Sequence, residues 1–168
     1  MTAAARVDPP YRGDELATLL GFLDYQRATL AGKCEGLSPE QLRLRADPPS
    51  NLSLLGLVRH LAEVERGWFR QGIAGEDIAD IWCSDQSRDA DLDEVDTAEV
   101  APAFQAWQAE IDAAQVIATT TPLDATMVHR SGDVISLRWV LVHMIEEYAR
   151  HNGHADLLRE HIDGVKGE

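Results

Sequence analysis

Cysteine and basic residues are both scarce in this chain. The two cysteines, Cys34 and Cys83, lie far apart and form no CxxC pair, so we expect buried or free thiols and not a disulfide framework or a zinc ribbon. Lysine and arginine number 15 against 29 aspartates and glutamates, which gives a net charge of -14. Because binding to a phosphate backbone depends on Lys and Arg, neither nucleic acid nor an anionic membrane surface is an expected partner.

Long hydrophobic runs are also missing. No run approaches the ~18 apolar residues that a membrane-spanning helix requires. The first residues, MTAAARVDPPYRGDE, contain no apolar core of the kind found in a signal peptide, so the expected location is the cytoplasm. With 168 residues and 45% hydrophobic content, the chain has the size and composition of a globular protein, and residues 1–168 are expected to form one domain.

Helical periodicity is what the chain does contain. Apolar residues recur at helical spacing in four long stretches, and Ser38-Pro39-Glu40-Gln41 is typical of a capping box that opens a short helix. The expected long helices run from about Asp14 to Cys34, from Ser50 or Ser53 to between Gly72 and Gly75, from the Asp96/Glu99 start to about Ala118, and from Ser136 past Leu158. No βαβ rhythm is present, so the predicted fold class is all-α, a four-helix bundle with a short extra helix.

Residues 76–96 form an acidic segment between the second and third long helices. The segment carries nine acidic side chains against one arginine. Such a run cannot bury itself, so we expect a long solvated loop that Ile78, Ile81 and Trp82 hold to the bundle. Residues 123–135 are expected to connect the third and last helices, with a little extended structure.

The stretch EEYARHNGHAD, residues 146–156, concentrates titratable side chains on the last helix. At about 100° per residue, His151 falls within the apolar stripe, and Glu147, four residues earlier, lies at the edge of the same face. Glu146 points away from the core. His143 and His154 lie near the boundary with solvent, and Gly153 is expected to allow close packing or a bend.

A third polar residue, His60, borders the apolar stripe of the second long helix. If these two helices pack side by side, His60, Glu147 and His151 converge. Three protein ligands with an open fourth position are typical of a catalytic zinc site, where bound water or thiol loses its proton near neutral pH. The alternatives are an i,i+4 charge pair between Glu147 and His151, or histidines that only complete the core.

The remaining histidines and the common catalytic motifs offer no competing site. His129 and His161 have no identifiable partners and are expected at the surface. The sequence contains no HEXXH, no pair of Glu-x-x-His motifs, no P-loop and no GxSxG elbow. Neither cysteine has an evident base beside it, so a cysteine nucleophile is weakly supported.

The order of these motifs resembles the DinB superfamily of metal-binding four-helix bundles. The segment GLVRHLAEVERGWF contains His60, and about ninety residues later SLRWVLVHMIEEYARHNGHADLLRE contains the other two candidate ligands. With RGDELATLLGFLDYQRATL and LSPEQL, the pattern covers nearly the whole chain and looks like the mycothiol-transferase-type group. The resemblance implies a divalent ion, with zinc favoured and nickel next, held by His60, Glu147 and His151. Many DinB-like proteins have His at the middle position, and Glu147 resembles instead the mycothiol-dependent maleylpyruvate isomerase branch.

The resemblance further implies a metal-dependent thiol S-transferase or isomerase. Its substrates would be a low-molecular-weight thiol such as mycothiol and an electrophile, and members of the superfamily are often homodimers. No catalytic side chain is identified beyond a metal-bound water or thiol. The alternative is a non-enzymatic metal-binding stress or interaction protein, in which the acidic segment binds a partner.

Overall fold

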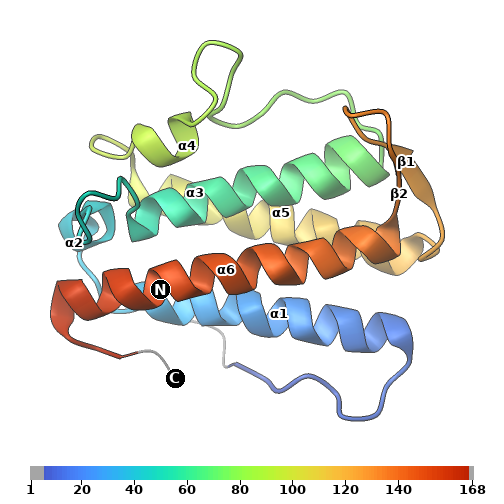
Figure 1. Ribbon diagram of the computed structural model, residues 1–168, viewed down its shortest axis with the longest axis horizontal. Helices are drawn as coiled ribbons and strands as arrows, with labels where there is room; N and C mark the ends of the chain where they lie inside the picture. The colour runs from blue at the N-terminus through green and yellow to red at the C-terminus, as the bar shows by residue number, and fades with distance from the viewer. Residues whose placement is uncertain (1–5, 167–168) are drawn as a thin grey trace.

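The computed structural model describes residues 6–166, and these form a bundle of four long helices (Figure 1). Their order is α1 (Glu15–Cys34), α2 (Pro39–Arg43), α3 (Leu54–Glu65) with its π-helical continuation η1 (Arg66–Ile73), α4 (Ala90–Asp93), α5 (Val100–Thr120), the strands β1 (Thr126–Val128) and β2 (Val134–Ser136), and α6 (Leu137–Asp163). The all-α prediction, including the short extra helix at α2, is confirmed.

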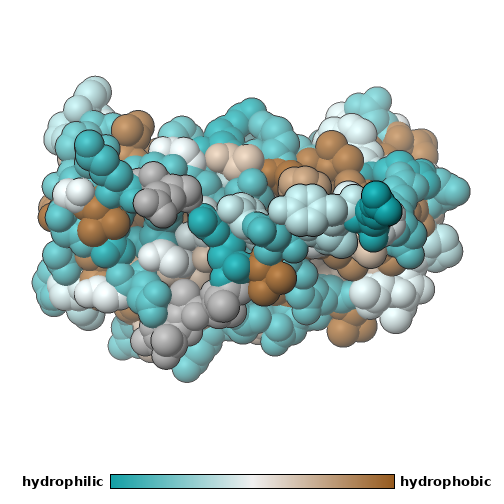
Figure 2. All heavy atoms as spheres, turned by 90° about the horizontal axis from the view of Figure 1, so that it is seen from below, coloured by the Kyte–Doolittle hydropathy of each residue, from teal (hydrophilic) through white to brown (hydrophobic). Residues whose placement is uncertain are grey.

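Helix pairing decides which side chains meet. Helix α1 packs along α6, α5 packs along α3, and α3 also contacts α6 (Figure 1). Apolar residues of all four long helices fill the space between them, including Leu23, Leu61, Trp107 and Met144. The face seen in Figure 2 is mostly polar, with hydrophobic residues in separate groups. Among residues 6–166, no helix combines the length and the apolar character that crossing a membrane requires.

Ser53 begins the helix that carries His60. Its side chain accepts a hydrogen bond from the Gly56 amide at 3.1 Å, and the residue is fully buried. Ser50, the other candidate from the sequence, instead accepts from the Leu52 amide in the preceding turn. Of the two serines that could begin this helix, Ser53 is therefore the one that caps it.

Replacing Ser53 with alanine should destabilise the protein by about 0.5–2 kcal/mol, because the helix loses the acceptor for one of its first amides. The Ser50→Ala variant is the matched control, and its effect should stay within about 0.5 kcal/mol. Urea unfolding of both variants measures the difference. Equal destabilisation by the two changes would contradict the assignment of the cap.

The buried face of α3 changes toward its C-terminus. Glu65 and Phe69 are the fully buried residues there, while Val64 and Trp68 are half-buried and pack against the core. Helix geometry also changes at Arg66, where the α-helix continues as a π-helix. A buried glutamate is tolerated because its carboxylate is hydrogen-bonded on both oxygens.

The Glu65 carboxylate lies at the centre of a buried polar network. Arg27 donates to both of its oxygens, at 2.8 and 2.7 Å, and the Tyr148 hydroxyl donates at 2.8 Å. The Trp107 indole donates in turn to the Tyr148 oxygen at 2.8 Å. The network thus connects α1, α3, α5 and α6 through side chains that are almost completely shielded from water.

A short antiparallel hairpin precedes the last helix. Strands β1 and β2 pair with Met127 opposite Ile135, which confirms some extended structure between residues 123 and 135. The hairpin lies close against η1, because a Cβ at Gly72 would come within 2.6 Å of the Met127 sulfur. Ser136 ends the hairpin and caps α6 by accepting from the Trp139 amide. The Asp96/Glu99 start predicted for α5 is three residues early, since the helix begins at Val100 without a side-chain cap.

The acidic segment, residues 76–96, is only partly the solvated loop that its composition predicts. Most of its acidic residues are exposed, but Asp91 is 3% exposed and Val95 is fully buried. Residues Ala90–Asp93 form the short helix α4, which packs on α3. The prediction failed here because one carboxylate of the segment finds a hydrogen-bonding partner inside the bundle, which composition cannot show.

Candidate metal centre

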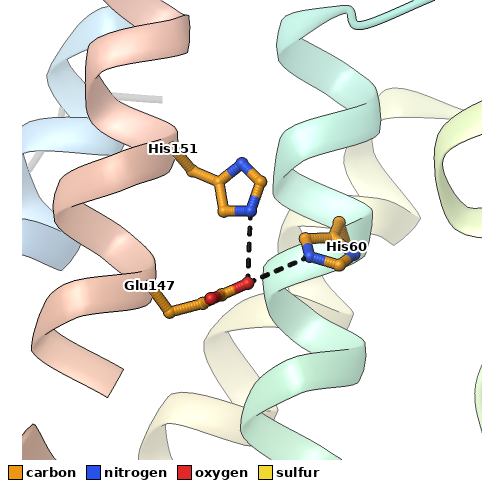
Figure 3. Close-up of side chains that lie close together, drawn as sticks. All are labelled: His60, Glu147 and His151. Atoms are coloured by element: carbon orange, nitrogen blue, oxygen red, sulfur yellow. Dashed lines mark hydrogen bonds and ion pairs between the residues drawn. The ribbon is translucent and has the colours of Figure 1, made fainter. Parts of the chain in front are cut away.

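His60, Glu147 and His151 meet where α3 packs against α6 (Figure 3). The Oε1 atom of Glu147 lies 3.4 Å from Nε2 of His60 and 3.2 Å from Nε2 of His151. The imidazole rings are 4.9 Å apart at an interplanar angle of 65°. Their side chains are 23%, 15% and 12% exposed in sequence order. The three candidate ligands from the sequence are therefore adjacent, at the edge of the core and in reach of solvent.

The spacing of these donor atoms suits a tetrahedral ion. Zinc–nitrogen and zinc–oxygen bonds of about 2.0–2.1 Å put neighbouring ligand atoms about 3.3 Å apart in a tetrahedron. Both separations from Glu147 Oε1 agree with that value, and all three donor atoms lie within 4.8 Å of one another. Two imidazoles and a carboxylate also suit zinc, nickel, iron or manganese chemically. The residues fit a divalent metal ion, and their role as ligands stays a prediction.

Two carboxylates that contact the same imidazole determine the charge at the site. Burial opposes the charged form of His60, but its hydrogen bonds to Asp91 and Glu147 outweigh burial and raise the pKa of the imidazole to about 9. Hydrogen bonds from His151 and His60 hold the pKa of Glu147 well below its usual range. The site therefore favours positive charge between its carboxylates, and a cation there would take the place of a proton.

Asp91 is a site residue that sequence reasoning missed. Its Oδ2 atom lies 2.8 Å from Nδ1 of His60, on the opposite side of the ring from Glu147. Hydrogen bonding to His60 keeps the pKa of Asp91 below its ordinary value despite burial. The sequence does hold a weak signal, since Ala90, Leu92 and Val95 give a short apolar pattern inside the acidic segment.

His143 and His154 lie beside the three candidate ligands, and donor atoms of His143, Glu146 and Glu147 lie within 4.8 Å of one another as a second group that could hold an ion. The Nδ1 atom of His143 faces Glu146 at 3.5 Å, and its ring packs between Trp68 and Trp139. His154 lies 3.4 Å from His151, nitrogen to nitrogen. Burial and the neighbouring positive charge lower the pKa of His154. Both histidines are half-buried, as expected for the boundary with solvent.

Three peripheral expectations have mixed outcomes. His161 is exposed as predicted, but His129 is half-buried, with its ring stacked on Trp68 at 5.5 Å. Glu146 is exposed and pairs with Arg150, which agrees with its predicted direction away from the core. Gly153 is exposed, and a Cβ there would meet nothing within 4 Å, so the expected close packing at this glycine is wrong.

The thiols of the chain do not supply a nucleophile. Burial raises the pKa of Cys34 to about 12. Burial and the nearby charges of Asp91 and Glu63 raise the pKa of Cys83 to about 12 as well. Both cysteines are free, and their raised pKa values disfavour the thiolate form that a nucleophile needs.

A separate groove of about 910 Å³ lies between α1, α2 and α5. Its walls include Ala31, Cys34, Leu42, Phe104 and Ile111, and none of the three candidate ligands lines it. Size alone would favour this groove as a binding site. The side chains that could hold a metal ion instead lie on α3 and α6, so we treat that region as the candidate site.

Comparison with known proteins agrees with the fold. The model of the Mycothiol-S-transferase family matches residues 18–164, a span that contains His60, Glu147 and His151. No curated protein matched the chain. Since the match covers most of the chain, from α1 to the end of α6, the protein belongs to the Mycothiol-S-transferase family, a DinB-like family.

Proposed function

We propose that the protein is a divalent-metal-dependent S-transferase acting on a low-molecular-weight thiol of the mycothiol type. The main observation in support is the position of Glu147 Oε1, which lies 3.4 Å from Nε2 of His60 and 3.2 Å from Nε2 of His151. These distances match the spacing of ligands around a tetrahedral ion. Membership of the Mycothiol-S-transferase family supports the thiol. Zinc is the ion we favour, with nickel next, as the resemblance to the DinB superfamily implies.

In this proposal, three side chains of the protein hold the ion. Glu147 and His151 are one helical turn apart on α6, so their relative position is set by the helix, and His60 closes the site from α3. Held by these three side chains, a divalent ion would favour the thiolate form of a coordinating thiol at neutral pH. The thiol sulfur forms a bond to an electrophilic carbon, the leaving group departs with its electron pair, and the thiol proton passes to solvent.

Purified protein loaded with zinc or nickel should catalyse transfer of mycothiol to an alkylating electrophile. Formation of the thioether is followed by mass spectrometry, with bacillithiol and glutathione as comparison thiols. Glu147→Ala should lose the activity, while Glu160→Gln, at an exposed position of the same helix, should retain it. The proposal fails if no thiol of the panel is transferred by metal-loaded protein.

A further inference from the structure

We propose that the acidic segment, residues 76–96, holds Asp91 as a positioning residue for His60, and that this contact strengthens divalent-metal binding at the proposed centre. The inference rests on the proposed metal site but concerns a residue that is not one of the three proposed ligands. The segment would then position a side chain beside the metal centre, whereas its composition suggests a solvated loop or a partner-binding surface.

The first support is the geometry of the His60 ring. One ring nitrogen, Nδ1, contacts Asp91 Oδ2 at 2.8 Å, and the other, Nε2, faces Glu147 Oε1 at 3.4 Å. A carboxylate that accepts from Nδ1 leaves the Nε2 lone pair for a metal and fixes the direction of the ring. The Asp91 side chain is 5% exposed, so water cannot easily replace it. Its other oxygen accepts from the Leu92 amide at 2.9 Å, which holds the carboxylate in place.

The second support is the attachment of the segment to α3 on both sides of Asp91. On one side, the Glu63 carboxylate accepts hydrogen bonds from the amides of Ile81, Trp82 and Cys83 at 2.6–3.0 Å. On the other, the Arg59 guanidinium donates to the Glu94 carbonyl oxygen. The same guanidinium lies over the Trp82 ring at 4.9 Å from its centroid.

These attachments share the helix that carries His60. Arg59 and Glu63 are four residues apart on α3, with His60 between them. A glutamate that binds three successive amides fixes a backbone that would otherwise be mobile and highly charged. The segment is therefore held against the same turn of helix whose histidine it must orient.

The test is to measure zinc affinity by competition with a chromophoric chelator. Every variant keeps the three candidate ligands intact. Asp91→Ala should bind zinc about 10–100-fold more weakly, the usual cost of losing a carboxylate behind a ligating histidine. Asp91→Asn keeps an acceptor oxygen and should recover part of the affinity. Asp93→Asn removes a charge from the same short helix α4 at an exposed position and should bind zinc as the unchanged protein does.

Proton NMR gives a readout that a purely structural role for Asp91 would not move. A slowly exchanging, downfield Nδ1–H signal of His60 is expected in the unchanged protein and in Asp93→Asn, and should disappear in Asp91→Ala. Glu63→Gln, which weakens the attachment but leaves Asp91 in place, should broaden that signal and weaken zinc binding by less than Asp91→Ala does.

The outcomes separate this inference from the proposed function. Tight zinc binding by Asp91→Ala, equal to that of the unchanged protein, would overturn the role of Asp91 and leave the metal centre standing. Absence of zinc binding by the unchanged protein would overturn both. Loss of affinity in Asp93→Asn equal to that in Asp91→Ala would show a general charge effect and would also reject the inference.

Discussion

Replacement of Glu147 by alanine is expected to remove stoichiometric metal from the purified protein. Glu147 supplies the oxygen that lies beside both imidazoles, so its loss leaves two histidines without the carboxylate that balances the charge of the ion. The affinity should fall by more than the roughly 10–100-fold that loss of an outer partner costs. Metal analysis after dialysis, with zinc titration of metal-free protein, measures the effect.

The matched control for this change is Glu160, an exposed glutamate near the end of the same helix. Glu160→Ala makes the same chemical change outside both groups that could hold an ion and should keep about one metal ion per chain. Thermal unfolding gives an independent check, because zinc at a hundred times its Kd stabilises a protein that binds it by about 2.7 kcal/mol. Stoichiometric metal in both Glu147→Ala and His151→Ala would defeat the assignment of the site.

Replacement of Glu65 by leucine should be among the most destabilising single changes in the protein. The Glu65 side chain is completely buried and the Arg27 side chain is 5% exposed. Removing the carboxylate leaves a buried guanidinium without its main partner and the Tyr148 hydroxyl without its acceptor. Breaking a buried ion pair in this way costs about 3–5 kcal/mol, which in a chain of this size lowers Tm by roughly 6–20 °C.

The double variant Arg27→Met with Glu65→Leu is the control. Removing both charges removes the desolvation penalty along with the attraction, so stability should return toward that of the unchanged protein. Calorimetry of the two single variants and the double variant completes a double-mutant cycle for this ion pair. A Glu65→Leu protein that unfolds at the same temperature as the unchanged protein would show that the network contributes little to stability.

The helices could be predicted because their signals are local. Asp14, Ser38, Ser53 and Ser136 each cap a helix through a side-chain oxygen, and these residues stand immediately before apolar periodicity in the sequence. The Asp96/Glu99 start was misplaced because α5 begins without such a bond. The change to π-helical geometry after Glu65 has no local signal that we can identify.

The candidate site was predictable only in part, because only some of its residues lie close together in the sequence. His151 and Glu147 lie four residues apart on one helix, so periodicity places them on one face. His60 could be added because its helix also has an apolar stripe. Asp91 was missed because its contact with His60 spans 31 positions and because the acidic composition of its segment outweighs the short apolar pattern around it.

The sequence by itself determined the number of long helices, the caps that begin most of them, and the side chains of α6 that share a face. These properties depend on residues within one or two turns of each other, where spacing and side-chain chemistry are sufficient. Tertiary structure alone decided that Glu65 is buried beside Arg27. It also decided that Asp91, in the mostly solvated acidic segment, contacts His60. A buried carboxylate is stable only beside its partner, and that partner lies on another helix, so its place is set when the helices pack.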